Sequence, residues 1–147
     1  MNGSCLNTPK PRLQMVVGLC FDLSRNMVAM VHKMSGPACV IGNWNGVGGK
    51  VDPGETPIQA MAREFREETG VDLPESEWSQ FAELNATNYD LFFFQAASTS
   101  VFQCRTMEKE PIKVWLARDL LGEANVMHNM RWMIPYLQDY DMIPHNL

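Results

Sequence analysis

Residues 49–71 of this 147-residue chain read GKVDPGETPIQAMAREFREETGV, and three glutamates stand out in the stretch. Glu64, Glu67 and Glu68 are spaced i, i+3 and i+4, which on an α-helix places their carboxylates on one face. Like charges at that spacing repel one another, so helix stability alone does not explain them. Carboxylate oxygens are the ligands that Mg²⁺ and Mn²⁺ prefer. The spacing therefore predicts a helix that carries the ligands of a divalent cation.

The same stretch contains start and stop signals for that helix. Thr56 is a suitable N-cap, and Pro57 suits the first helical position. Gly70 suits the position just after the last turn, where a left-handed backbone is common. An apolar stripe for the core is formed by Ile58, Met61, Ala62 and Phe65. The three glutamates lie largely off this stripe, so we expect them to face away from the core.

The rest of the composition is typical of one globular domain. Hydrophobic residues make up 46% of the chain and charged residues 20%, at a length that can bury a core. We therefore expect a single domain over residues 1–147, with the polar residues 1–11 as a loose N-terminal lead-in. The net charge is −5 without any basic run, which argues against duplex nucleic acid as a partner. The sequence shows no export signal or membrane span, so we expect a cytoplasmic protein without membrane contact.

Cysteine spacing indicates neither a zinc site nor a disulfide framework. Cys5, Cys20, Cys39 and Cys104 include no CxxC pair. We expect four reduced and mostly buried thiols.

Hydrophobic patterning predicts a sheet and a second helix around the glutamate helix. Strands are expected at residues 13–21, 27–31, 47–51, 78–84, 89–97 and 112–117. Residues 34–46 predict a loop, and residues 98–110 a polar connection. The second helix is expected over residues 129–140, with Pro135 as a kink or break. This order indicates an α+β or mixed α/β layered domain.

The complete pattern of residues 49–71 resembles the Nudix box, G-x5-E-x7-R-E-U-x-E-E-x-G-U, in which U is a bulky apolar residue. Phe65 and Val71 occupy the two U positions, although Phe65 is aromatic rather than aliphatic. The resemblance implies the Nudix fold, an α/β/α sandwich on a mixed sheet. All the fixed positions are filled, by Gly49, Glu55, Arg63, Glu64, Glu67, Glu68 and Gly70.

The resemblance also implies a hydrolase that needs a divalent cation and acts on a nucleoside diphosphate linked to another moiety. By the family pattern, Glu64, Glu67 and Glu68 are ligands of Mg²⁺, for which Mn²⁺ can substitute. The metal would polarise a phosphoryl oxygen and activate the attacking water. Several members recruit a further carboxylate from a loop beyond the box, as a ligand or a base. Glu108 and Glu110 are the candidates here, and we favour Glu108.

Other residues of the box have expected supporting roles. Arg63 and Glu55, eight positions apart, would pair and clamp the loop to the helix. We count Arg63 with the catalytic residues, and Glu55 and Gly70 as structural support. Gly48 and Gly49 can adopt positive φ and let the backbone approach a ligand closely.

The segment WNGVGGK, which leads into the box, is similar to the W-N-G-x-G-G-K stretch of MutT-like members that hydrolyse nucleoside triphosphates. An indole can stack on a base, and an Asn side chain can both donate to a base edge and accept from it. The alternative is that the tryptophan packs in the core and the asparagine forms a turn. The expected substrate-binding residues of this segment are Trp44, Asn45, Gly48, Gly49 and Lys50.

Residues 126–132, VMHNMRW, are a second candidate for contact with the base. In relatives that clear oxidised purine nucleotides, a pair of acidic residues near this place reads the base. His128 and Asn129 stand here instead, which argues against specificity for an oxidised purine. An ordinary surface histidine is the alternative for His128. The tryptophans at positions 78, 115 and 132 are expected in the core.

We therefore predict a Mg²⁺-dependent pyrophosphohydrolase that clears nucleotides by converting a nucleoside triphosphate into a monophosphate and pyrophosphate. One alternative is a diphosphatase for ADP-ribose, a dinucleotide or a nucleotide sugar. Another is a nucleotide-binding module without catalysis. The MutT-like form of residues 44–50 favours triphosphates. The expected partner is the small nucleotide itself, and the chain is expected to be a monomer or a homodimer.

Overall fold

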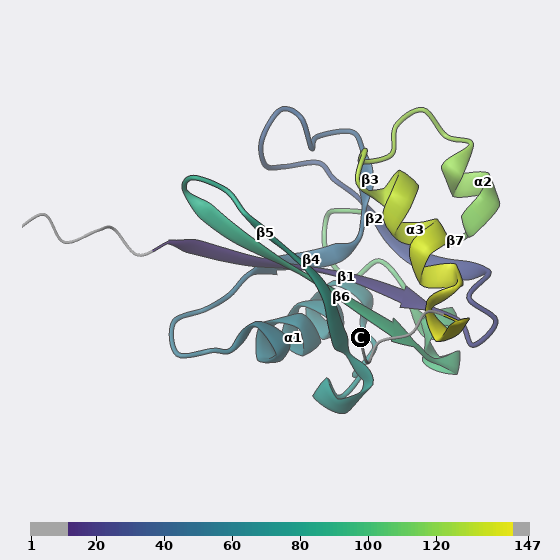
Figure 1. Ribbon diagram of the computed structural model, residues 1–147, viewed down its shortest axis with the longest axis horizontal. Coiled ribbons are helices and arrows are strands. Elements are labelled where there is room, and N and C mark those ends of the chain that lie inside the picture. The colour runs from purple at the N-terminus through teal and green to yellow at the C-terminus, as the bar shows by residue number, and fades with distance from the viewer. Residues whose placement is uncertain (1–11, 143–147) are drawn as a thin grey trace, which may run out of the picture.

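The computed structural model describes residues 12–142, and a mixed sheet of seven strands forms its centre (Figure 1). The strands are β1 (Leu13–Phe21), β2 (Met27–His32), β3 (Trp44–Asn45), β4 (Val47–Lys50), β5 (Ser79–Asn85), β6 (Tyr89–Ala97) and β7 (Ile112–Leu116). The expected layered α+β domain on a mixed sheet is confirmed.

β1 is the central strand because it pairs with three others. It runs parallel to β6 over its whole length, from Leu13 opposite Tyr89 to Phe21 opposite Ala97. It also pairs antiparallel with β4 and, through its last residues, with β2. β2 in turn carries β3 and β7, while β5 pairs with β6. β1 thereby joins the two halves of the sheet.

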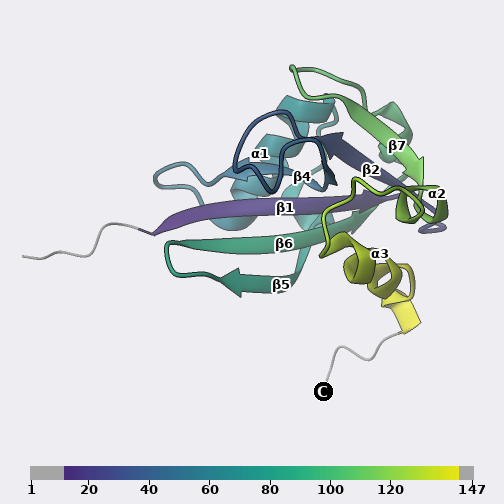
Figure 2. The same cartoon turned by 90° about the horizontal axis from the view of Figure 1, so that it is seen from above.

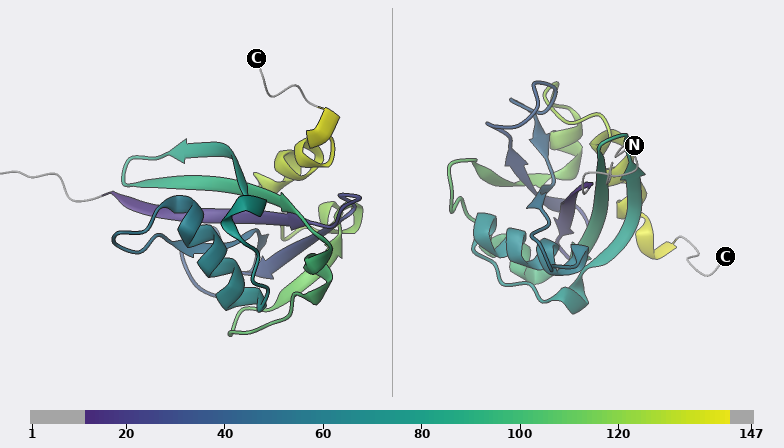
Figure 3. Two further views of the ribbon diagram at one scale, coloured as in Figure 1. Left: turned by 90° about the horizontal axis from the view of Figure 1, so that it is seen from below. Right: turned by 90° about the vertical axis from the view of Figure 1, so that its left-hand side faces the viewer.

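Helices cover both faces of this sheet (Figures 2 and 3). The α-helices are α1 (Pro57–Thr69), α2 (Ala117–Leu121) and α3 (Met130–Gln138), and the 3₁₀ turns are η2 (Glu75–Glu77), η3 (Thr99–Gln103) and η4 (Tyr140–Met142). α1 packs on one face, and α2 and α3 pack on the other. Within residues 12–142, no helix has both the length and the apolar character needed to cross a membrane.

Two hydrophobic cores hold these layers together. Alternate residues of β1 point to opposite faces, so Val16 packs towards α1 while Leu19 and Phe21 pack towards α3. On the α1 side, the rings of Phe65 and Trp78 meet edge to face with centroids 5.1 Å apart. Burying such a large apolar side chain contributes about 1.5–3 kcal/mol, so the two cores fix where α1 and α3 lie.

The ends of α1 follow the predicted signals. Thr56 Oγ1 accepts from the backbone N–H of Gln59, and Gln59 Oε1 accepts from that of Thr56, which forms a capping box. Pro57 is the first helical residue, and Gly70 ends the helix with φ of 78°. The helix that carries the glutamates is therefore confirmed at both ends.

The structure corrects the predicted loop and one predicted strand. Residues 34–46 do not form only a loop, because Trp44 and Asn45 form the short strand β3 against β2. A strand of two residues has no periodicity that a sequence pattern can reveal. β7 ends at Leu116, and Ala117 begins the short helix α2, which was not predicted.

α3 and the side-chain burial bring further corrections. Pro135 neither ends nor breaks α3, which continues to Gln138 because Met133, Ile134 and Leu137 pack in the core. Trp132 is 54% exposed, so its expected place in the core is wrong. Cys20 is buried, Cys104 is half-buried and Cys39 is exposed, so the thiols are not mostly buried; Cys5 lies outside the described residues.

Candidate functional site

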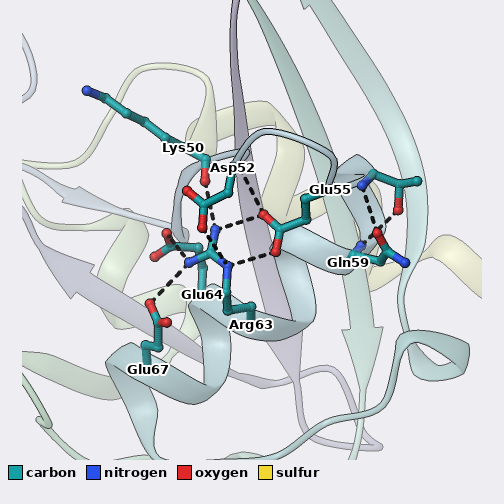
Figure 4. Close-up of polar contacts among 8 residues, drawn as sticks. Lys50, Asp52, Glu55, Gln59, Arg63, Glu64 and Glu67 are labelled. Carbon is teal, nitrogen blue, oxygen red and sulfur yellow. Dashed lines mark hydrogen bonds and ion pairs between the residues drawn. The ribbon is translucent and has the colours of Figure 1, made fainter.

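Arg63 ties the loop before α1 to the helix (Figure 4). Its Nε and Nη2 donate to the two carboxylate oxygens of Glu55 at 2.8 and 2.9 Å. Nη2 also donates to the carbonyl oxygen of Lys50 at 2.9 Å. Hydrogen bonding to Arg63 holds the pKa of the Glu55 carboxyl below its usual range. The expected pairing is present, and its two-pronged geometry fixes the loop more firmly than a single contact.

The same guanidinium reaches the glutamates of the helix face (Figure 4). Nη1 of Arg63 donates to Glu64 Oε1 at 2.9 Å and to Glu67 Oε2 at 3.1 Å. Glu68 turns towards β4, where its Oε2 accepts from the backbone N–H of Gly48 at 3.2 Å. Glu67 is exposed, while Glu64 and Glu68 are half-buried. The three carboxylates share one region of α1, but each has its own contact.

Each of the three carboxylates of α1 is held by a contact of its own. Among residues 12–142, no group of three or more His, Cys, Asp or Glu side chains is close enough to hold a metal ion. Arg63 accounts for the separation, because it binds Glu64 and Glu67 while Glu68 binds the chain at Gly48. Glu67 is the exposed member, and an exposed side chain changes rotamer on a nanosecond timescale.

The charges around Glu64 and Glu68 nevertheless suit a divalent cation. Burial raises the pKa of Glu68 to about 8, the charge of Glu64 adds to the rise, and Lys33 opposes it. Burial is also the main cause of a raised pKa at Glu64. Two neighbouring carboxylates that resist ionisation gain from a nearby cation, and oxygen donors match the preference of Mg²⁺ and Mn²⁺. The donor set therefore fits the expected metal.

The glycines of β4 serve tight packing rather than an unusual backbone conformation. Neither Gly48 nor Gly49 has positive φ, so that expectation is wrong. A Cβ on Gly49 would lie 2.6 Å from the carboxyl carbon of Glu64, and one on Gly48 would collide with the carbonyl oxygen of Val16. These glycines leave room for β1 and for the Glu64 carboxylate. The exposed Lys50 side chain extends away from the carboxylates (Figure 4).

The loop before β7 docks on the C-terminal end of α1. The N–H groups of Arg105 and Met107 donate to the carbonyl oxygens of Thr69 and Glu68 at 3.0 and 3.3 Å. Glu108 follows directly, and its charge contributes to the raised pKa values of Glu64 and Glu68. Glu108 is thus the neighbour of the residue that bonds to the Glu68 carbonyl, at the C-terminal end of α1.

Glu110 has a different partner, which the sequence reasoning missed. Lys33 Nζ lies 2.9 Å from Glu110 Oε1 in an ion pair. This pair depends on the register of β7 against β2, which no local sequence pattern gives.

Trp44 and Asn45 make the contacts of packing and turn residues. The Trp44 ring lies 5.0 Å from the His32 ring and 5.2 Å from the Trp115 ring, measured between centroids. The backbone N–H of Trp44 donates to the carbonyl oxygen of Asn125, and its carbonyl oxygen accepts from the N–H of Met127, in the segment before α3. Asn45 Oδ1 accepts from the next backbone N–H, that of Gly46, at 2.9 Å. The structure therefore favours the packing alternative for this pair.

Asn129 and His128 are adjacent in the sequence but have different surroundings. A cavity of about 270 Å³ lies between β5, β6 and α3, and its lining includes Leu84, Phe93, Asn129 and Trp132. The Oδ1 atom of Asn129 is buried and has no hydrogen-bond partner among the described residues. His128 is exposed and does not line the cavity. Of the two residues predicted to contact the base, Asn129 lines this cavity and His128 does not. The sequence did not predict that Leu84, Phe93 and Trp132 line the same cavity.

Comparison with known proteins places this geometry in context. The family model described as the NUDIX domain matches residues 13–137. A structure from work on MutT of Aliivibrio salmonicida and Vibrio cholerae is similar, with a TM-score of 0.67, 21% identity and coverage of 86% of this chain and 96% of that chain. The NUDIX domain of Shewanella oneidensis NrtR, complexed with ADP ribose, gives a TM-score of 0.70 at 20% identity, covering 95% and 96%.

A third similar structure is the bifunctional NMN adenylyltransferase/ADP ribose pyrophosphatase of Francisella tularensis, complexed with AMP and a Mn ion. It has a TM-score of 0.67 and 17% identity, with coverage of 92% of this chain and 44% of that chain. At these identities, the three likenesses establish the shared fold.

Proposed function

Because the chain belongs to the Nudix family and is a pyrophosphohydrolase, we propose that it hydrolyses a nucleoside triphosphate to the monophosphate and pyrophosphate with Mg²⁺. The observation that carries the proposal is the complete box, in which Arg63 joins the loop residue Glu55 to the glutamates of α1. The MutT-like form of residues 44–50 favours a triphosphate. We place the activity in the cytoplasm, where nucleotides occur together with reduced thiols.

The residues of the box and Glu108 have different roles in the proposed hydrolysis. When held by Glu64, Glu67 and Glu68, Mg²⁺, or Mn²⁺ in its place, supplies charge neutralisation and a polarised phosphoryl group. Arg63 keeps two of these carboxylates near the loop, so the substrate meets a prearranged site. A carboxylate oxygen of Glu108 takes the proton of the attacking water while the P–O bond between the monophosphate and pyrophosphate parts of the substrate breaks. Its place directly after Met107, whose N–H donates to the Glu68 carbonyl oxygen, supports this role.

Recognition of the base is assigned to the cavity between the sheet and α3. The half-buried Asn129 has an amide oxygen without a partner within residues 12–142, and such an oxygen gains a hydrogen bond from a donor on a base edge. Trp132 lines the same cavity with an exposed indole that can stack on the base. Trp44 and Asn45 support this region through packing and a turn, and we assign the backbone of Gly48, Gly49 and Lys50 to contact with the phosphates.

A panel of substrates tests this proposal. The purified chain is assayed in Mg²⁺ with canonical and modified deoxynucleoside triphosphates, ADP-ribose, dinucleotides and nucleotide sugars, and the products are separated by chromatography. We expect the highest kcat/KM for a triphosphate, with pyrophosphate as the second product and no turnover in EDTA. A clear preference for ADP-ribose or a nucleotide sugar would contradict the substrate. Binding without turnover of any compound would contradict the catalytic role.

A further inference from the structure

Lys33 and Glu110 extend the face of the sheet that carries α1. Val31 on β2 and Ile112 on β7 are paired across the strands, and both pack against the core under α1. Lys33 lies two residues after Val31, and Glu110 two residues before Ile112. Because side chains alternate between faces, Lys33 and Glu110 form the next pair on the same face. This pair therefore lies on the side of the sheet where α1 presents its glutamates.

The carboxylate of Glu110 is a fixed anchor for the ammonium of Lys33. The Nζ atom lies 2.9 Å from Glu110 Oε1, and the two side chains are only 20% and 17% exposed. The other oxygen, Oε2, accepts from the backbone N–H groups of Met34 and Ser35. Hydrogen bonding to Lys33 and to these N–H groups holds the pKa of Glu110 below its usual range, against the opposing effect of burial. The ammonium is thereby held in one orientation.

Lys33 has hydrogen-bonding capacity that Arg63 lacks. A guanidinium has five N–H donors, and all five of Arg63 are engaged by Glu55, Glu64, Glu67 and the Lys50 carbonyl. An ammonium has three donors, of which Glu110 takes one. The register of β7 against β2 places this ammonium on the side of the sheet that α1 covers.

We infer that Lys33 binds the phosphate chain of the substrate, and that Glu110 positions its ammonium instead of acting as the distal carboxylate. This inference rests on the proposed function, because it requires a phosphorylated substrate at the glutamate face of α1. It assigns different tasks to the two acidic residues of the loop: Glu108 acts on the attacking water, and Glu110 holds the cation that meets the phosphates.

The test compares Lys33→Met with a matched removal of charge on the opposite face. Lys113 is the control, since its ammonium lies 3.6 Å from the ring centroid of Trp115, on the α3 side of the sheet. KM is measured with the triphosphate that the wild type hydrolyses fastest, and binding of inorganic pyrophosphate with Mg²⁺ by calorimetry. We expect Lys33→Met to raise KM and weaken pyrophosphate binding about tenfold or more, with kcat little changed. Lys113→Met should change neither, and Lys33→Arg should restore part of the loss.

Variants of the anchor separate positioning from catalysis. Glu110→Gln should raise KM less than Lys33→Met and keep kcat, whereas Glu108→Gln should lower kcat. The double variant Lys33→Met/Glu110→Leu avoids an unpaired half-buried carboxylate, and thermal unfolding checks that each variant is folded. Unchanged KM and pyrophosphate affinity in the folded Lys33 variants would overturn the inference, as would an equal effect of Lys113→Met or a collapse of kcat in Glu110→Gln. Absence of triphosphate hydrolysis by the wild type would instead contradict the proposed function.

Discussion

Two regions of the molecule are built in different ways. One is the set of hydrogen bonds from Arg63 to Lys50, Glu55, Glu64 and Glu67, which we call the clamp, and the other is the cavity that Asn129 lines. The clamp joins Lys50, Glu55 and the first turns of α1, so its partners are close in the sequence. The cavity takes its lining from β5, β6 and α3, which come together only in the folded sheet. In the proposed function, the reaction thus depends on a local motif with fixed spacing, while selection of the nucleotide depends on contacts between distant segments. We therefore expect that substitutions in one region leave the other unchanged.

The largest expected effect comes from a glutamate of the clamp region. Glu67→Gln should lower kcat about 100-fold or more, because it removes a proposed metal ligand whose chemistry contributes several kcal/mol. The side chain is exposed, so thermal unfolding should change little. Glu75→Gln, an exposed glutamate on η2, is the matched control. A kcat equal to that of the wild type would contradict the ligand assignment.

The contrast between the two regions also explains what the sequence could predict. Thr56, Pro57 and Gly70 mark the ends of α1 through local backbone chemistry, and the spacing of Glu55 and Arg63 anticipates their pairing. The partner of Glu110 depends instead on the register of β7 against β2.

Side-chain surroundings were harder to predict than strands and helices for the same reason. Trp132 and Trp115 are both tryptophans in regular elements, yet one is exposed beside a cavity and the other is buried. Asn129 and His128 are adjacent, yet only Asn129 lines the cavity. The positions of the sheet and α3 decide these differences, and no local pattern contains that information.

Arg63→Lys tests how much the clamp contributes to the fold. A lysine ammonium cannot reproduce the planar pair of bonds to Glu55 together with the bonds to Lys50, Glu64 and Glu67. We expect the free energy of unfolding to fall by about 2 kcal/mol, measured by urea denaturation without metal. Arg66→Lys, on an exposed position of the same helix, should have little effect. Equal stability of the Arg63 variant and the wild type would show that the clamp does not support the fold.

Asn129→Leu tests the cavity, where stability and specificity should change in opposite directions. The substitution removes a buried oxygen that has no partner among the described residues, so stability should hold or rise slightly. The preference among bases should fall about tenfold in kcat/KM, because a polar contact to the base edge is lost. His128→Gln is the comparison, since His128 is exposed. A larger change of preference in the His128 variant would assign base reading to that residue.

The smallest effect is expected from Glu55→Gln, through its dependence on pH. Arg63 holds the pKa of Glu55 below its usual range in the folded protein, so the folded state favours the ionised carboxylate more than the unfolded chain does. The stability from this ion pair is present above the ordinary carboxyl pKa and is lost as pH falls through the lowered value. The variant should be less stable than the wild type by about 1 kcal/mol near neutral pH. That difference should shrink towards zero in acid, where the wild-type carboxyl is also neutral, as followed by urea denaturation at a series of pH values. A difference that stays constant across the series would mean that Glu55 supports the loop through uncharged contacts, such as the hydrogen bond from the Asp52 N–H to its Oε1.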